Sequence, residues 1–145
     1  FEGGTVTWAP TNITYGHNNR SAQFRLPQNR YCIENRAADM TMNVYLAFSM
    51  TLSAAVEGIK KKIHPGKPTD QDLYNMTDSE FKKLGIKRLP RNLLMAIEAL
   101  KNDKLSDEVI GSVMKKSLLA YKNDEWERYH QAVTDWEVKE YLRLY

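Results

Sequence analysis

The pattern of hydrophobic and polar positions changes once along the chain. From Val6 to about Arg36, β-branched and aromatic residues alternate with polar ones between turn signals, which predicts strands. From about Asp39 onward, apolar residues recur every three or four positions, which predicts helices. Strands followed by helices indicate an α+β fold, here antiparallel strands and a hairpin followed by about five helices.

The first predicted helix is apolar around most of its girth and ends near the run Lys60-Lys61-Lys62. A helix that is hydrophobic on most sides is typically buried, so we expect its apolar positions to lie in the core. These positions are Tyr45, Phe48, Leu52, Val56 and Ile59.

The later helices have recognisable starts. Residues 77–80 and 134–137 both have capping-box form, with a threonine followed by a glutamate three positions on. Pro90 suits the first turn of another helix, and Ser106-Asp107-Glu108 opens the next. We therefore expect helices to begin near these four points.

Residues 18–36 read as a β-hairpin that carries four arginines and a single glutamate. Alternation places Ala22, Phe24 and Leu26 on one face, and the second strand places Tyr31 and Ile33 on an apolar face as well. The opposite face of the second strand carries Glu34 and Arg36, and Arg25 can lie across from them if the turn is tight.

Two interpretations of this charged face remain open. The first is a solvated surface with ion pairs worth about 0–1 kcal/mol each. The second is an anion clamp, because arginine offers fixed bidentate geometry to phosphates and carboxylates, and a nearby carboxylate can hold a divalent cation.

Composition narrows the class of protein. A length of 145 residues suits one domain, and no apolar run approaches the roughly 20 residues that span a bilayer, so we expect no membrane partner. The net charge of +3 is mild and argues against nucleic-acid binding. A single cysteine, Cys32, agrees with a cytoplasmic setting. The start, Phe1-Glu2-Gly3-Gly4, has no signal-peptide pattern, and we expect it to be a cut end within a longer protein.

Several ordered motifs resemble the C-terminal part of the glutamine synthetase catalytic domain. They are N-R-S-A-Q-F-R-L-P at 19–27, I-E-N-R at 33–36, N-V-Y-L-A-F at 43–48 and E-G-I at 57–59. The resemblance implies that residues 1–145 form a C-terminal segment of such a domain, with the N-terminal half absent.

The resemblance also implies a function. The parent protein would be an ATP-dependent ligase that forms glutamine from glutamate and ammonia through a γ-glutamyl phosphate, with Mg²⁺ or Mn²⁺ as cofactor. It would be cytoplasmic and assemble as a homo-oligomeric ring, and the isolated segment would be inactive.

Roles for individual residues follow from the same resemblance. Arg20 would contact both ATP phosphate and substrate, and Arg25 would bind ATP phosphate. Glu34 would ligate the metal, and Arg36 would hold the amino-acid substrate or its phosphorylated form, so that Arg20 and Arg36 are the catalytic candidates. Tyr74 resembles a tyrosine that some relatives adenylylate, and we expect it to be exposed on a loop.

One departure from the family pattern opens an alternative. Trp8 occupies a place where bacterial relatives carry a glutamate that helps deprotonate ammonium, although Glu2 could serve instead if the segment is slipped. The parent could then be a γ-glutamyl ligase for an alkylamine or polyamine. A non-catalytic family relative is a further alternative, and the sequence upstream of Phe1 would discriminate between them.

Overall fold

The computed structural model describes residues 9–142 and residue 144, so Trp8 and Glu2 lie outside the described residues. The chain divides into two compact units, Phe1–Leu89 and Pro90–Tyr145.

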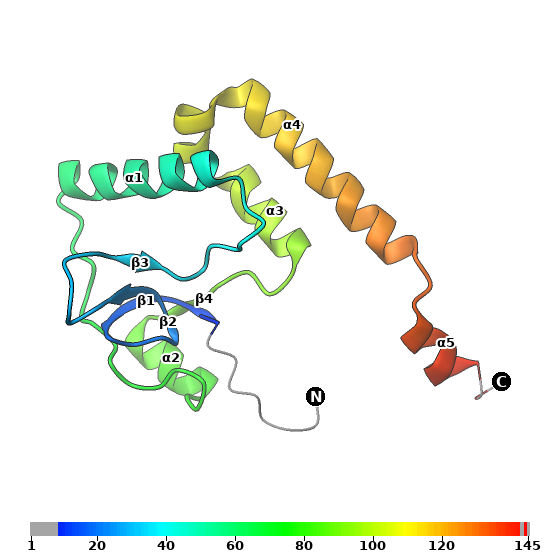
Figure 1. The fold of residues 1–145 in the computed structure, drawn as a ribbon, viewed down its shortest axis with the longest axis horizontal. Coiled ribbons are helices and arrows are strands. Elements are labelled where there is room, and N and C mark those ends of the chain that lie inside the picture. Colours follow the sequence, from blue (N-terminus) through cyan, green and yellow to red (C-terminus); the bar gives the residue numbers. More distant parts are fainter. Residues whose placement is uncertain (1–8, 143, 145) are drawn as a thin grey trace. The chain divides into compact units, whose positions relative to one another are not determined.

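The first unit contains a four-stranded sheet with the strand order β3-β2-β1-β4 (Figure 1). Strands β1 and β2 pair in parallel, and the other two pairs are antiparallel. The unit also contains two helices. Its elements are β1 (Asn12–His17), β2 (Ala22–Leu26), β3 (Glu34–Asn35), α1 (Val44–Lys60), α2 (Asp78–Leu84) and β4 (Lys87–Arg88).

The parallel pairing of β1 and β2 corrects the expectation of purely antiparallel strands. Parallel neighbours usually need a crossover of a dozen or more residues, whereas residues 18–21 suffice between these two short strands. Asn18 adopts a left-handed conformation with φ of 54°, and its N–H donates to the Leu26 carbonyl at 2.8 Å. The chain therefore turns back toward the start of β1 instead of forming a hairpin.

The predicted hairpin is formed by β2 and β3, with Phe24 opposite Asn35 and Arg25 opposite Glu34. The expected apolar face of its second strand is wrong, because Tyr31 and Ile33 are exposed and precede β3. A local turn precedes the strand, and in it the Cys32 N–H donates to the Arg30 carbonyl at 3.1 Å. Strand β3 therefore begins only at Glu34.

A small hydrophobic core lies in the first unit. It consists of Ala22 from β2, Leu73 and Phe81, with Met76 and Ile86 packed against it. The first residue of β2, Ala22, is therefore packed in this core and holds the start of the strand in place.

Helix α1 begins after Asn43, whose side chain accepts hydrogen bonds from the N–H groups of Tyr45 and Leu46. The expectation that α1 is buried is wrong, since none of its residues is buried. The five predicted core positions are between 47% and 81% exposed. Periodicity identified the apolar stripe correctly, but burial depends on a neighbouring element, which the pattern of one helix cannot supply.

The second unit contains α3 (Leu93–Asn102), α4 (Lys104–Gln131) and α5 (Asp135–Tyr141). Both predicted capping boxes are confirmed, at Thr77 before α2 and at Thr134 before α5. The other two helices start slightly away from the expected points, because the side chains of Asn92 and Asp103 provide the N-caps.

Helix α4 is interrupted at Gly111, which has φ of 75° and ψ of 154°. Lys115 is nearly buried beyond this kink, and its Nζ donates to the Asp103 carbonyl at 2.7 Å and pairs with Asp107 at 3.0 Å. These bonds tie the second part of α4 to its own start. The α+β fold class is thus confirmed, and no helix among the described residues has the length and apolar character needed to cross a membrane.

We predict that Gly16→Ala destabilises the sheet. A Cβ at this position in β1 would lie 2.2 Å from the Thr69 carbonyl oxygen and 2.8 Å from the Asn19 Cβ. Overpacking of this kind costs about 1–3 kcal/mol. Hydrogen–deuterium exchange of the β1 and β2 amides measures the loss of stability.

Gly58→Ala is the matched control. A Cβ at Gly58, inside α1, would meet no atom within 4 Å, so this change should leave the sheet unaffected and stabilise α1 by about 0.5–1 kcal/mol. Equal protection of the β1 amides in the two variants would contradict the close approach of Thr69.

Candidate functional site

The centre of the candidate site is an ion pair between Arg25 on β2 and Glu34 on β3. The two residues are direct neighbours in the antiparallel register. Arg25 Nη1 donates to both carboxylate oxygens of Glu34, at 3.0 and 3.1 Å, and the side chains are only 15% and 22% exposed. This confirms the expected position of Arg25 across from Glu34.

Two further arginines surround the same carboxylate. Arg30 Nη2 donates to Glu34 Oε1, and Arg36 Nη1 lies 3.7 Å from Glu34 Oε2. We call Arg25, Arg30, Glu34 and Arg36 the arginine cluster. Its three guanidinium groups outnumber the single carboxylate, so the cluster is electropositive and suited to anions.

The arginines keep Glu34 ionised. Hydrogen bonds from Arg25 first, and then from Arg30, lower the pKa of the Glu34 carboxyl below its ordinary value, and burial opposes them only in part. The same contact raises the pKa of the Arg30 guanidinium. Both shifts favour the charged forms of Glu34 and Arg30.

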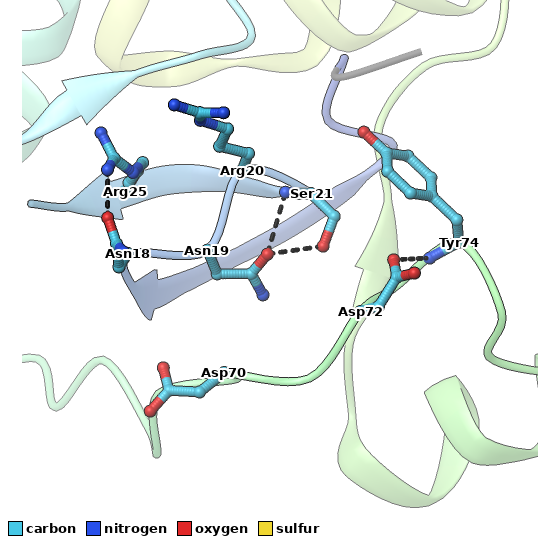
Figure 2. A pocket seen from close by; sticks show the side chains of 8 residues that line it. All are labelled: Asn18, Asn19, Arg20, Ser21, Arg25, Asp70, Asp72 and Tyr74. Carbon is cyan, nitrogen blue, oxygen red and sulfur yellow. Dashed lines mark hydrogen bonds between the residues drawn. The ribbon is translucent and has the colours of Figure 1, made fainter. Parts of the chain in front are cut away.

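Arg20 lies on the turn between β1 and β2, next to the arginine cluster. Its carbonyl oxygen accepts a hydrogen bond from Arg36 Nε at 3.0 Å. On the same turn, the Asn18 side-chain oxygen accepts from Arg25 Nη2 (Figure 2). The turn between β1 and β2 thus contacts two arginines of the cluster.

A pocket of about 660 Å³ opens beside this turn. Every residue that lines it carries a polar group, so the pocket offers hydrogen-bond partners to a ligand. Arg20 and Arg25 provide positive charge, and Asp70 and Asp72 provide negative charge. The lining residues are Asn18, Asn19, Arg20, Ser21, Arg25, Asp70, Asp72 and Tyr74 (Figure 2).

Tyr74 is half-buried at the edge of this pocket. Its hydroxyl donates to the Ala9 carbonyl at 2.6 Å, and its N–H donates to Asp72 Oδ1 at 3.0 Å. Burial raises the pKa of the Tyr74 hydroxyl. The side chain is less accessible than the sequence led us to expect, and its modification stays a prediction.

The donor set limits how a metal could bind. Among residues 9–142 and 144, no group of three or more histidine, cysteine, aspartate or glutamate side chains is placed to hold an ion. Glu34 is ionised and fits as one oxygen ligand, provided that an ion replaces some of its arginine contacts. Among the described residues, Glu34 would thus be a single ligand and not a complete metal site.

The structure brings all the predicted arginines and Glu34 into one region. Sequence reasoning missed Asn18, Asn19 and Asp70. The spacing Asn19-x-Ser21 is typical of an Asx turn and could have indicated the local bond. The contacts of Asn19 with Thr69 and Gln71 had no signal, because about 50 residues separate the partners.

The chain is similar to known proteins over nearly its whole length. The family model described as "Glutamine synthetase, catalytic domain" matches residues 5–141. A glutamine synthetase of Methanocaldococcus jannaschii is 39% identical over 137 residues, which are 92% of this chain and 30% of that protein. A glutamate–methylamine ligase of Methyloversatilis universalis is 38% identical over 140 residues, which are 97% of this chain and 31% of that protein.

A solved structure described as a GmaS/ADP complex has the same fold, with a TM-score of 0.83 and 32% sequence identity. The match covers 99% of this chain and 33% of that one. The chain thus spans about a third of the length of the relatives that it matches.

We predict that Glu34 titrates below the ordinary range of a glutamate. Because its pKa is lowered in the folded state, its contribution to stability is complete at neutral pH and is lost as the pH falls below the ordinary glutamate pKa and through the lowered value. Side-chain carboxyl NMR measures the pKa directly, and Arg25→Gln should raise it.

Glu80 is the internal control, since hydrogen bonds from Thr77 lower its pKa and Arg25 plays no part. Its titration should not change in Arg25→Gln. An ordinary pKa for Glu34 in the unaltered protein would contradict the paired geometry.

Proposed function

The chain belongs to the glutamine synthetase family, and from this premise we propose that it is the C-terminal segment of the catalytic domain of an ATP-dependent ligase. The full-length protein would form glutamine from glutamate and ammonia through a γ-glutamyl phosphate. The observation that carries the proposal is the arginine cluster around Glu34, with Arg20 beside it.

The proposed chemistry needs preorganised positive charge. A γ-carboxylate oxygen of glutamate attacks the terminal phosphorus of ATP and ADP leaves, after which ammonia attacks the acyl carbon and phosphate leaves. Negative charge is carried by the transferring phosphoryl group, where fixed cations stabilise the transition state most effectively. Arg20 and Arg25 would bind ATP phosphate, and Arg20 and Arg36 would hold the amino acid and its acyl phosphate.

Glu34 would be one ligand of Mg²⁺ or Mn²⁺, which when bound neutralises phosphate charge. Its lowered pKa supports this role, because only the ionised carboxylate is a good ligand. The remaining ligands would come from the part of the protein that this chain does not contain. For that reason we expect no ligation by the 145-residue chain alone.

Other properties of the parent follow from the family. We propose a cytoplasmic, homo-oligomeric ring that acts on ATP, glutamate and an amine and does not bind nucleic acid. The mild net charge of +3 supports the last point. Adenylylation of Tyr74 belongs to the same set of proposals, and its hydroxyl would have to leave the Ala9 carbonyl first.

A second candidate function is γ-glutamyl transfer to an alkylamine. It is favoured by the similarity to a glutamate–methylamine ligase and to the GmaS/ADP complex. Trp8 is compatible with it, since an indole offers an apolar wall and a face that attracts alkylated cations, in place of a carboxylate. Glutamine synthesis stays the leading proposal.

We predict that Arg36→Lys in the full-length enzyme greatly slows phosphate release with ATP, glutamate and ammonia. Lysine keeps the charge but loses the planar fork, and transition-state stabilisation should fall by about 2–4 kcal/mol. Glu34→Gln should raise the concentration of divalent ion that is required for half-maximal rate.

The same exchange at an exposed ion pair is the control. Arg128→Lys on α4, where the arginine pairs with Asp124 on the helix surface, should leave the kinetics unchanged. Near-normal rates in both Arg36→Lys and Glu34→Gln would contradict the catalytic roles. The arginine cluster would then be interpreted as a set of surface ion pairs.

We predict that ammonia is the preferred acceptor. Ammonia, methylamine and putrescine should be compared by phosphate release from the full-length enzyme, with glutamate and ATP saturating. A kcat/KM for ammonia at least tenfold higher, about 1.4 kcal/mol, excludes the alkylamine alternative. The opposite order would establish that alternative and reject glutamine synthesis as the main reaction.

A further inference from the structure

We propose that Asn19 is a positioning residue whose buried carboxamide fixes the turn that carries Arg20 and, through the Arg20 backbone, the side chain of Arg36. The inference rests on the proposed function, which gives these two arginines their roles. Asn19 is among the residues that line the pocket, but its carboxamide is fully hydrogen-bonded within the protein, so we assign it no direct contact with substrate or nucleotide.

The carboxamide of Asn19 uses its full hydrogen-bonding capacity inside the protein. Its Nδ2 donates to the carbonyl oxygens of Thr69 at 2.7 Å and Gln71 at 2.8 Å. Its Oδ1 accepts from the N–H of Ser21 at 2.9 Å and from the Ser21 hydroxyl at 2.6 Å. An asparagine side chain has two donor hydrogens and two acceptor lone pairs, and all four are satisfied here at 9% exposure.

These bonds involve the residues immediately before and after Arg20 in the chain. The bond from Ser21 N–H back to Asn19 closes an Asx turn with Arg20 at its centre. Figure 2 shows the Arg20 side chain leaving the turn on the side away from the Asn19 carboxamide. The backbone of Arg20 is thereby fixed while its side chain stays directed away from the anchor.

The same turn holds Arg36. The Arg20 carbonyl oxygen accepts from Arg36 Nε at 3.0 Å, and the backbone N–H of Arg36 donates to the Gln23 carbonyl at 2.8 Å. Together with the ion pair to Glu34, these bonds position Arg36, and the bond to the Arg20 carbonyl moves with the turn. A shift of the turn would displace two candidate catalytic groups at once.

The segment to which Asn19 is bound is itself hydrogen-bonded to β1 and to the turn. Thr69 N–H donates to the Tyr15 carbonyl at 2.8 Å, and Leu73, which is 1% exposed, donates its N–H to the Ser21 hydroxyl at 3.1 Å. Gly16 has no Cβ and so allows the Thr69 carbonyl to approach. The turn is therefore hydrogen-bonded to two buried residues of the first unit, Thr69 and Leu73.

The test uses Asn19→Asp in the full-length enzyme. Aspartate has the same shape but places an acceptor oxygen against the Thr69 and Gln71 carbonyls, where Asn19 donated. We expect kcat/KM for ATP-dependent phosphate release to fall by about 100-fold, the usual effect of a small displacement of reacting groups. Asn123→Asp, an exposed α4 residue that donates to the Leu119 carbonyl, is the matched control and should have no effect.

A double-mutant cycle with Arg36→Lys separates positioning from stability. If Asn19 acts through Arg36, adding Asn19→Asp to Arg36→Lys lowers kcat/KM by much less than the factor it causes alone. A purely structural role predicts that the two factors multiply, or that the loss disappears when rates are referred to folded protein by circular dichroism. Either of these results overturns the inference.

A milder variant covers the case in which Asn19→Asp fails to fold. Ser21→Ala removes the hydroxyl that donates to Asn19 and accepts from Leu73, but keeps the Ser21 N–H bond that closes the turn. It should lower kcat/KM in the same direction, by about tenfold or less, with the same coupling to Arg36→Lys. Normal kinetics in this variant would contradict positioning by the carboxamide.

Failure of the inference is distinguishable from failure of the proposed function. If Arg36→Lys abolishes most activity while Asn19→Asp leaves it normal, the positioning role is wrong and the arginine roles stand. If Arg36→Lys itself has near-normal activity, the proposed function of the arginines fails, and the positioning role fails with it.

Discussion

The ion pair between Arg25 and Glu34 is the contact on which the candidate site depends. It joins β2 to β3 in a register that a slip of one residue would destroy, because every side chain would then change faces. Exposed ion pairs contribute little to stability, but this one is largely covered and doubly hydrogen-bonded. Arg30 and Arg36 contact the same carboxylate.

Under the proposed function, the arginine cluster would supply one part of a complete site. It would provide cations for phosphates and carboxylates, together with one carboxylate that its neighbours keep ionised. An ATP-dependent ligase also needs further metal ligands and groups that receive the amine. Under the proposed function, these would come from the two-thirds of the family chain that lie outside the match.

The sequence predicted what depends on neighbours close in the chain. The Arg25–Glu34 register and the caps at Thr77 and Thr134 need partners at most nine residues away, and all are confirmed. The burial of α1 and the pairing of β1 with β2 depend on what the rest of the fold places beside them, and both expectations were wrong. The contacts of Asn19 were missed for the same reason, since its two carbonyl partners carry no side-chain signature.

This difference in sequence separation has a consequence for the order of folding. Closing the nine-residue loop between Arg25 and Glu34 costs less chain entropy than closing the 50-residue loop between Asn19 and Thr69, by about 1.5 kcal/mol. The hairpin can therefore form while the turn at Arg20 is still unanchored. In a newly synthesised chain, the ion pair between Arg25 and Glu34 would form first. The turn at Arg20 would be fixed last, when residues 69–73 bind to it.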